Sequence, residues 1–294
     1  MKKQDEAGVL AEPPPPARVV CAPHNEGVEA LDRVWARTEL RLTAPDGDQG
    51  PVDETAEGHF QFARPGQVSL TVSKVGETYF CLGSGAERYW WMDLRRPRWA
   101  LIGDLSRATP EAVALLGVPV HPVDLIDLVG ILPIEPSDGE ASWSADGRSV
   151  VVSSPGRWGT TRQWVFSAGD WRLEGVRILD ERGEVRCESS LAGASRVEFR
   201  DDPSRIAVVP TRVTVRVPES RTTISIRLYD PQNRGTGMNM AVFNPDHLVR
   251  AYNIPADSVG SMEEAASRAA ARKSAARPED APFERDPPAG TKGP

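Results

Sequence analysis

The chain has 294 residues, of which 39% are hydrophobic and 26% are charged, and its formal net charge is -7. This length fits one large domain or two small ones, and the hydrophobic content suffices for a core. The acidic balance argues against a general nucleic-acid-binding protein, because no basic excess is present to replace phosphate counterions. No run of about 18 apolar residues occurs, so the sequence predicts no membrane-spanning helix.

The N-terminus reads as a flexible tether. Its first residues include two lysines but no apolar core segment of a signal peptide, and Pro13 to Pro16 favour an extended conformation. Two interpretations stay open: the native protein begins here and is cytosolic, or an export signal has been replaced by Met1.

The three cysteines are Cys21, Cys81 and Cys187. An odd number cannot form a closed set of disulfides, and no CxxC spacing indicates zinc. We interpret them as small buried side chains, with a single bridge as the alternative.

The first regular elements are predicted to be a helix and then a strand. In Asn25–Arg37, apolar residues recur every three or four positions, and Asn25 is a suitable N-cap. Residues Thr38–Thr43 alternate as a strand does, and the polar segment 44–56 is predicted to be a long loop.

The segment Glu57–Gly103 is predicted to form five short antiparallel strands. Apolar and polar residues alternate along it, as at Phe60 and Phe62, and clusters of Gly and Pro mark the turns. Such a sheet has one apolar face, which another part of the chain must cover.

A helical insert is predicted between Thr109 and Pro133. Thr109 suits an N-cap, Pro110 suits the first helical position, and Gly117 would end this first helix. A second helical segment, Pro122–Val129, carries an apolar stripe with Asp124 and Asp127 outside it, in a solvated position. Because both segments are too short to be stable alone, we expect them to pack on the sheet.

Strands resume after residue 139, for a total of about eleven to thirteen, which is typical of a sandwich or an open barrel. Beyond Asp257 the alternation stops. A helix could form from Met262 to Ala276, and the Pro-rich, charged residues after it are predicted to be disordered.

No motif indicates catalysis. Gly83-Ser84-Gly85 is not a nucleophile elbow, and Gly235-Thr236-Gly237 does not match a phosphate-binding loop. The spacing of His121, Asp124 and Asp127 does not place three ligands on one helix face. We therefore predict a protein that is not an enzyme and has no metal site and no cofactor.

Aromatic residues are the most distinctive feature. Most of the eight tryptophans and seven phenylalanines fall on predicted strands. They form either the core of a large sheet or the wall of an apolar cavity that the short helices do not fill.

Three stretches carry a resemblance to a known family: EGHFQFARPGQVSL, LGSGAERYWWM and PVDLIDLVGILP. With the order helix, meander, helical insert and further strands, they resemble the LolA/LolB lipoprotein-carrier superfamily, over about Arg18 to His247. The resemblance implies a strongly curved, incomplete antiparallel barrel, with helices over a cavity that holds acyl chains. The functional arginine of the carriers and the protruding apolar loop residue of the acceptors have no clear counterpart here.

We therefore predict an α+β fold: a strongly curved antiparallel sheet, an incomplete β-barrel, with a few short helices covering its concave face. Residues 1–17 would be the tether, 18–255 the domain, and 256–294 a disordered or partly helical tail. The predicted function is non-catalytic binding of a lipid, an acyl chain or a lipoprotein in the periplasm or at the outer membrane. A lipid anchor on the native form stays open. The alternative is a scaffold protein with a packed sheet that binds an envelope protein. The predicted lining of the apolar cavity is Trp35, Phe60, Phe62, Leu70, Phe80, Trp90, Leu125, Ile126, Leu128, Trp164 and Trp171.

Overall fold

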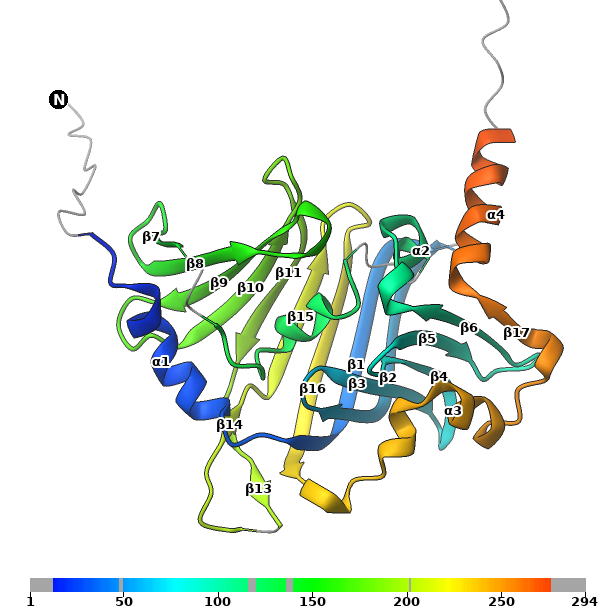
Figure 1. Ribbon diagram of the computed structural model, residues 1–294, viewed down its shortest axis with the longest axis horizontal. Coiled ribbons are helices and arrows are strands. Elements are labelled where there is room, and N and C mark those ends of the chain that lie inside the picture. Colours follow the sequence, from blue (N-terminus) through cyan, green and yellow to red (C-terminus); the bar gives the residue numbers. More distant parts are fainter. Residues whose placement is uncertain (1–12, 48–49, 116–119, 136–139, 201, 276–294) are drawn as a thin grey trace, which may run out of the picture.

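A computed structural model of the chain describes residues 13–47, 50–115, 120–135, 140–200 and 202–275 (Figure 1). The largest element of the described part of the chain is one sheet of 15 strands. The strands before the helical insert are β1 (Arg33–Gly47), β2 (Gly50–Ala63), β3 (Gln67–Lys74), β4 (Glu77–Ser84), β5 (Arg88–Asp93) and β6 (Trp99–Asp104). The strands after it are β7 (Glu140–Trp143), β8 (Ser149–Pro155), β9 (Thr161–Ser167), β10 (Leu173–Leu179), β11 (Val185–Ala192), β13 (Glu198–Phe199), β15 (Arg212–Val217), β16 (Thr222–Asn233) and β17 (Val259–Ser261).

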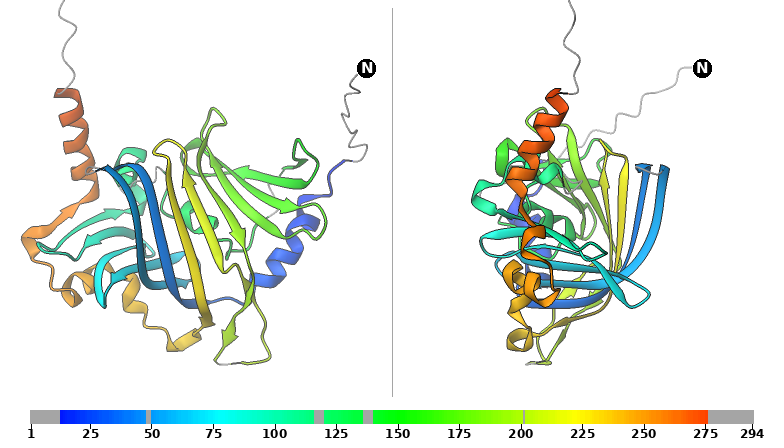
Figure 2. Two further views of the ribbon diagram at one scale, coloured as in Figure 1. Left: turned by 180° about the vertical axis from the view of Figure 1, so that it is seen from behind. Right: turned by 90° about the vertical axis from the view of Figure 1, so that its right-hand side faces the viewer.

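The sheet is open and mainly antiparallel. Its order is β17-β6-β5-β4-β3-β2-β1-β16-β15-β11-β10-β9-β8-β7, with β13 attached to β16. Only β17 with β6 and β13 with β16 pair in parallel among the described strands. The edge strands β17 and β7 lie at opposite ends, so the sheet does not close into a barrel (Figures 1 and 2). A separate two-stranded sheet joins β12 (Ser195–Arg196) and β14 (Val208–Val209).

Helices and short 3-10 turns accompany the sheet. The α-helices are α1 (Ala17–Val28), α2 (Pro110–Ala114), α3 (Pro245–Ala251) and α4 (Met262–Ala275). The 3-10 turns are η1 (Leu105–Arg107), η2 (Asp124–Val129), η4 (Arg157–Gly159), η5 (Gly235–Gly237), η6 (Met240–Phe243) and η7 (Ala256–Ser258). None of the described helices is long and apolar enough to cross a membrane.

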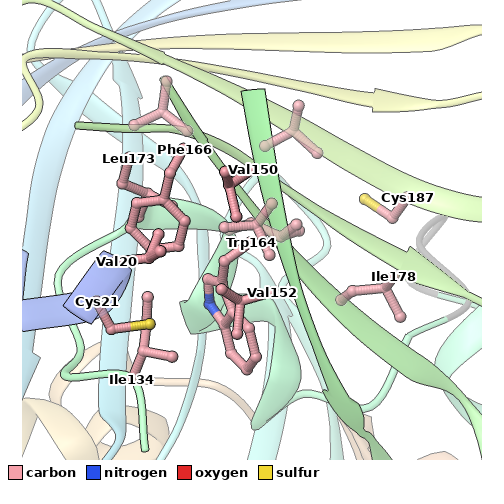
Figure 3. Packing of buried hydrophobic residues seen from close by; sticks show 14 of the residues in the cluster. Val20, Cys21, Ile134, Val150, Val152, Trp164, Phe166, Leu173, Ile178 and Cys187 are labelled. Carbon is pink, nitrogen blue, oxygen red and sulfur yellow. The ribbon is translucent and has the colours of Figure 1, made fainter. Parts of the chain in front are cut away.

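The two faces of the sheet are covered by different elements. We call the face that packs against α1, η2, α2 and α4 the inner face, and the opposite face, which packs against α3, the outer face. On the inner face, α1 inserts Val20 and Cys21 into a cluster with Trp164 and Phe166 (Figure 3). Asn25 of α1 exchanges two hydrogen bonds with the backbone of Ile134, at 2.7 and 2.8 Å, which fixes the helix to the end of the insert.

The predicted helix over Asn25–Arg37 is wrong at both ends, since α1 ends at Val28 and β1 already begins at Arg33. Val34 and Ala36 are buried, while Trp35 is half-buried and Arg37 is exposed, so this segment has the period of a strand. Its backbone pairs with β2 on one side and β16 on the other. Long-range pairing of this kind overrides a helical spacing that is only local.

The other predictions of elements have mixed outcomes. The first helix of the insert begins as expected, with the Thr109 hydroxyl accepting a hydrogen bond from the backbone of Ala112 and with Pro110 at its start. Gly117 lies outside the described residues. The segment 44–56 is not simply a loop, because most of it belongs to the β1–β2 ribbon. The main sheet has 15 strands rather than eleven to thirteen, and its predicted strong curvature remains a prediction.

The C-terminal part of the chain extends the sheet. Val259–Ser261 pairs with β6 as strand β17, and α4 follows almost over the range expected for a helix. Met262 and Ala266 of α4 are buried against α2 and Tyr89. Up to Ala275, the segment that was expected to be a disordered or partly helical tail therefore contributes a strand and a packed helix.

All three cysteines are buried and free, in agreement with the interpretation as small buried side chains. Burial raises the pKa of the Cys81 thiol to about 11 and that of Cys187 to about 12. Neither thiol is therefore a ready nucleophile.

Candidate functional site

The inner face of β2–β6 bears a row of apolar side chains that other elements cover only in part. Phe60, Leu70, Leu82, Trp91 and Leu101 lie directly opposite one another in successive strands. Directly opposed residues point to the same face. We call the half-buried members of this face the inner strip: Val68, Leu70, Val72, Phe80, Leu82, Trp91 and Leu101.

The two ends of the inner strip join packed clusters. Val68 and Leu70 pack beside buried Phe60 and Phe62, whereas Trp91 and Leu101 pack beside buried residues of α2 and α4. Between these ends, the rings of Phe80 and Trp91 lie 5.6 Å apart. The strip is therefore a row of half-buried apolar side chains, and the guanidinium of Arg95 lies 4.7 Å from the centre of the Phe80 ring.

The helical insert occupies the middle of the inner face. Its turn η2 sends Ile126 into the cluster of Phe60 and Phe62, and Leu128 into the cluster of Trp164. Both side chains are 2% exposed. Leu125 is half-buried, and the turn ends at Gly130, which adopts a left-handed conformation.

Nine of the predicted lining residues lie on the inner face: Phe60, Phe62, Leu70, Phe80, Leu125, Ile126, Leu128, Trp164 and Trp171. The structure does not bring Trp35 and Trp90 to them. Trp90 is 1% exposed and packs on the outer face against Leu248 of α3. Trp35 packs with Met238 and Phe243 in a separate cluster.

Trp35 lies between two other groups of the outer face. Its ring stacks on the His59 ring at 5.4 Å, and the guanidinium of Arg234 lies 3.9 Å from its centroid. These contacts are on the side of the sheet away from the insert, so Trp35 is not a part of the candidate site.

Two ion pairs fasten the insert to the β8–β9 hairpin. Asp124 and Arg157 approach to 2.6 Å, and Asp127 and Arg162 to 3.1 Å. The two carboxylate side chains are only 1% and 8% exposed. We call these four residues the clasp.

Aromatic contacts reinforce the clasp. The ring of Trp158, from η4 in the same hairpin, meets the His121 ring edge-on at 4.8 Å. Trp158 also packs beside the cluster of α2 and α4 and has a left-handed backbone with φ of 56°. A non-glycine residue in that conformation is strained and persists only where its surroundings hold it.

The clasp corrects the prediction that Asp124 and Asp127 face solvent. Sequence reasoning missed it because Arg157 and Arg162 are 33 and 35 residues away from their partners. The available signal was a pair of carboxylates three residues apart in an otherwise apolar turn, since a buried carboxylate requires a cationic partner.

The clasp has a pH-dependent component. The pKa of Asp127 is raised to about 6, because burial disfavours its charged form more than Arg162 favours it. In the unfolded chain its pKa is about 3.9, so between about pH 4 and pH 6 the folded state holds the extra proton. The stability that this proton contributes is therefore lost as the pH rises through 6.

We predict that the unfolding free energy of the natural chain minus that of Asp127→Asn is larger at pH 4 than at pH 7. Asparagine keeps the shape of the side chain but cannot titrate. Urea unfolding of both proteins across this pH range measures the difference. A difference that instead grows toward pH 7 contradicts a raised pKa.

Two shallow hollows lie on the outer face: one is lined by residues of β9, β10, β11 and β15, and the other by residues 211–212 and 227–229. No group of three or more histidine, cysteine, aspartate or glutamate side chains within the described ranges is placed to hold a metal ion. The candidate site thus consists of the inner strip, with the insert and its clasp beside it.

Comparison with known proteins gives structural neighbours only. No family model and no curated protein matches the sequence. The chain is similar to the crystal structure of a LolA superfamily protein from Nitrosomonas europaea, with 12% identity over 80% of this chain and 100% of that one, and a TM-score of 0.49.

Two further neighbours are similar to the same extent. One is a domain from Vibrio parahaemolyticus that is described as an outer membrane lipoprotein-sorting protein, with 9% identity, coverage of 78% and 97%, and a TM-score of 0.48. The other is a DUF1329 family protein from Desulfovibrio piger, with 9% identity, coverage of 79% and 97%, and a TM-score of 0.46. The neighbours include the superfamily that the sequence resembles. At these identities and TM-scores, the likeness carries no information on what this chain binds.

Proposed function

We propose that the protein is a non-catalytic carrier of the cell envelope that binds an acyl chain, of a lipid or a lipoprotein, along the inner strip. The observation that carries this proposal is the half-buried row of apolar side chains from Leu70 to Leu101. Soluble proteins rarely leave a contiguous apolar surface accessible unless it binds something. A periplasmic or outer-membrane location is a part of the same proposal.

Binding would be driven by removal of the chain from water. Each buried methylene group contributes about 0.8 kcal/mol, so a chain of ordinary length needs only the strip and no specific polar contact. The turn η2, with Leu125, Ile126 and Leu128, would act as the cover. Its displacement would add Phe60 and Phe62 to the apolar surface, and the clasp would oppose that displacement.

The alternative is a scaffold that binds an envelope protein through its surface. The tight packing of the Trp164 cluster and the position of the described hollows on the outer face favour this alternative. Native mass spectrometry of protein purified without detergent, followed by lipid extraction, separates the two. An acyl species bound at a ratio near one to one supports the carrier. A mass of the protein alone, with no uptake of a fluorescent fatty acid, supports the scaffold.

Leu82→Ala is expected to weaken binding of a fluorescent fatty acid by about tenfold, because it removes methylene contacts from the middle of the strip. Leu82 is half-buried and belongs to none of the buried clusters, so its loss should affect folding less. Leu115→Ala is the matched control, since Leu115 is 41% exposed and lies outside the strip. An equal loss of stability and binding in Leu82→Ala would mean that the strip is ordinary core.

A further inference from the structure

A shallow hollow lies on the outer face where the register between β15 and β16 ends. Arg212 and Arg227 form the last pair of this register, and just beyond it the backbone N–H of Leu228 donates to the Thr211 carbonyl at 2.8 Å. The hollow has a volume of about 280 Å³ and is lined by Thr211, Arg212, Arg227, Leu228 and Tyr229.

The two arginines are an unfavourable pair for the protein alone. Arg212 and Arg227 lie directly opposite each other, and like charges in that position destabilise a sheet. On its other side, Arg212 faces Ala192 of β11. Within the described residues Arg212 has no ion pair and no side-chain hydrogen bond, and its side chain is exposed.

The second hollow on the outer face shows what a balanced arrangement looks like. It has a volume of about 170 Å³, and its Arg177 and Arg216 both approach Glu188, at 3.7 and 3.9 Å. Each cationic residue there has an acidic neighbour. The hollow at Arg212 contains two cations and no acid in its lining.

Arg227 is held in place by its neighbours. Its Nη1 donates to the Tyr229 hydroxyl at 3.2 Å, and that hydroxyl donates to a Glu39 carboxylate oxygen at 3.4 Å. Glu39 lies opposite Arg227 on β1, where it offsets part of one positive charge. Glu39 carries one negative charge, whereas Arg212 and Arg227 together carry two positive charges. At least one positive charge at the hollow therefore stays unmatched.

We propose that Arg212 and Arg227 form a site for a phosphate group, either of a soluble phosphate or of a lipid headgroup. The planar guanidinium presents paired N–H donors that fit two oxygens of a phosphate, and an anion between two arginines removes their mutual repulsion. Bulk attraction does not explain such binding, because the chain has a net charge of -7. This inference does not rest on the proposed carriage of acyl chains, which concerns the opposite face.

In the first test, the full chain is titrated with inorganic phosphate at constant ionic strength. Changes in amide chemical shifts and in the melting temperature report binding. Arg212→Gln is expected to weaken phosphate binding about tenfold, and Glu39→Gln is expected to strengthen it because a competing carboxylate is removed. Arg216→Gln is the control, since Arg216 lies on the same strand and face, four residues away, next to Glu188. All three residues are on the surface, and the melting temperature without phosphate shows whether each variant folds.

The second test uses vesicles of phosphatidylcholine with and without phosphatidylglycerol, in sedimentation assays. Binding that requires phosphatidylglycerol and is lost in Arg212→Gln identifies a lipid headgroup as the source of the phosphate. Binding of inorganic phosphate without vesicle binding identifies a soluble source. If chloride at equal ionic strength has the same effect as phosphate, or if Arg212→Gln and Arg216→Gln lose binding equally, the proposal is overturned.

Discussion

Arg157→Ala is expected to lower the free energy of unfolding by about 3 kcal/mol, because it leaves the carboxylate of Asp124 buried without its cation. The Asp124 side chain is 1% exposed, and the ion pair is the shortest contact of the clasp, at 2.6 Å. The substitution also removes the anchor that holds η2 against the β8–β9 hairpin. Urea unfolding measures the stability, and proteolysis within residues 120–135 measures the local release of the insert.

Two companion variants make this result specific. Arg172→Ala removes an ion pair whose side chains are 68% and 39% exposed, and should cost less than about 1 kcal/mol. Adding Asp124→Asn to Arg157→Ala removes the uncompensated charge, so the double variant should be more stable than Arg157→Ala alone. A double variant that is less stable would show that Asp124 contributes through contacts other than its charge.

The sequence predicts the parts of this fold that depend on local patterns. The alternation around Phe60 and Phe62 and the Thr109-Pro110 start of α2 concern neighbouring residues, and the structure agrees with both. The prediction of a helix over Asn25–Arg37 was wrong because the apolar spacing suits a helix in isolation. In the fold, β2 and β16 together supply the hydrogen bonds of a strand. Such pairing involves partners up to about 200 residues away and leaves no local trace.

The candidate site could be predicted only in outline. The aromatic residues of the strands indicated an apolar face, but alternation alone does not say which of two adjacent tryptophans points to which side. The clasp depends on arginines that look like ordinary surface residues in the sequence. The charge pair Arg212 and Arg227 likewise appears only when β15 and β16 are placed side by side.

Trp90→Ala is expected to cost about 3 to 5 kcal/mol of unfolding free energy, because it empties a large, fully buried position. Trp90 packs with Cys81, Met92 and residues of α3 on the outer face. Its sequence neighbour Trp91 is half-buried on the inner strip, so Trp91→Ala should cost about 1 to 2 kcal/mol.

The two variants should reverse their order when acyl binding is measured. Trp91 forms part of the proposed binding surface, so Trp91→Ala should weaken the uptake of a fluorescent fatty acid more than Trp90→Ala does, at a temperature where both variants are folded. Each substitution removes the same side chain from adjacent positions, which differ in burial and in the face of the sheet. If both variants lose stability and binding in proportion, the inner strip serves the core alone, which supports the scaffold alternative. If Trp90→Ala loses more stability and Trp91→Ala loses more binding, the outer face serves the core and the inner face serves binding.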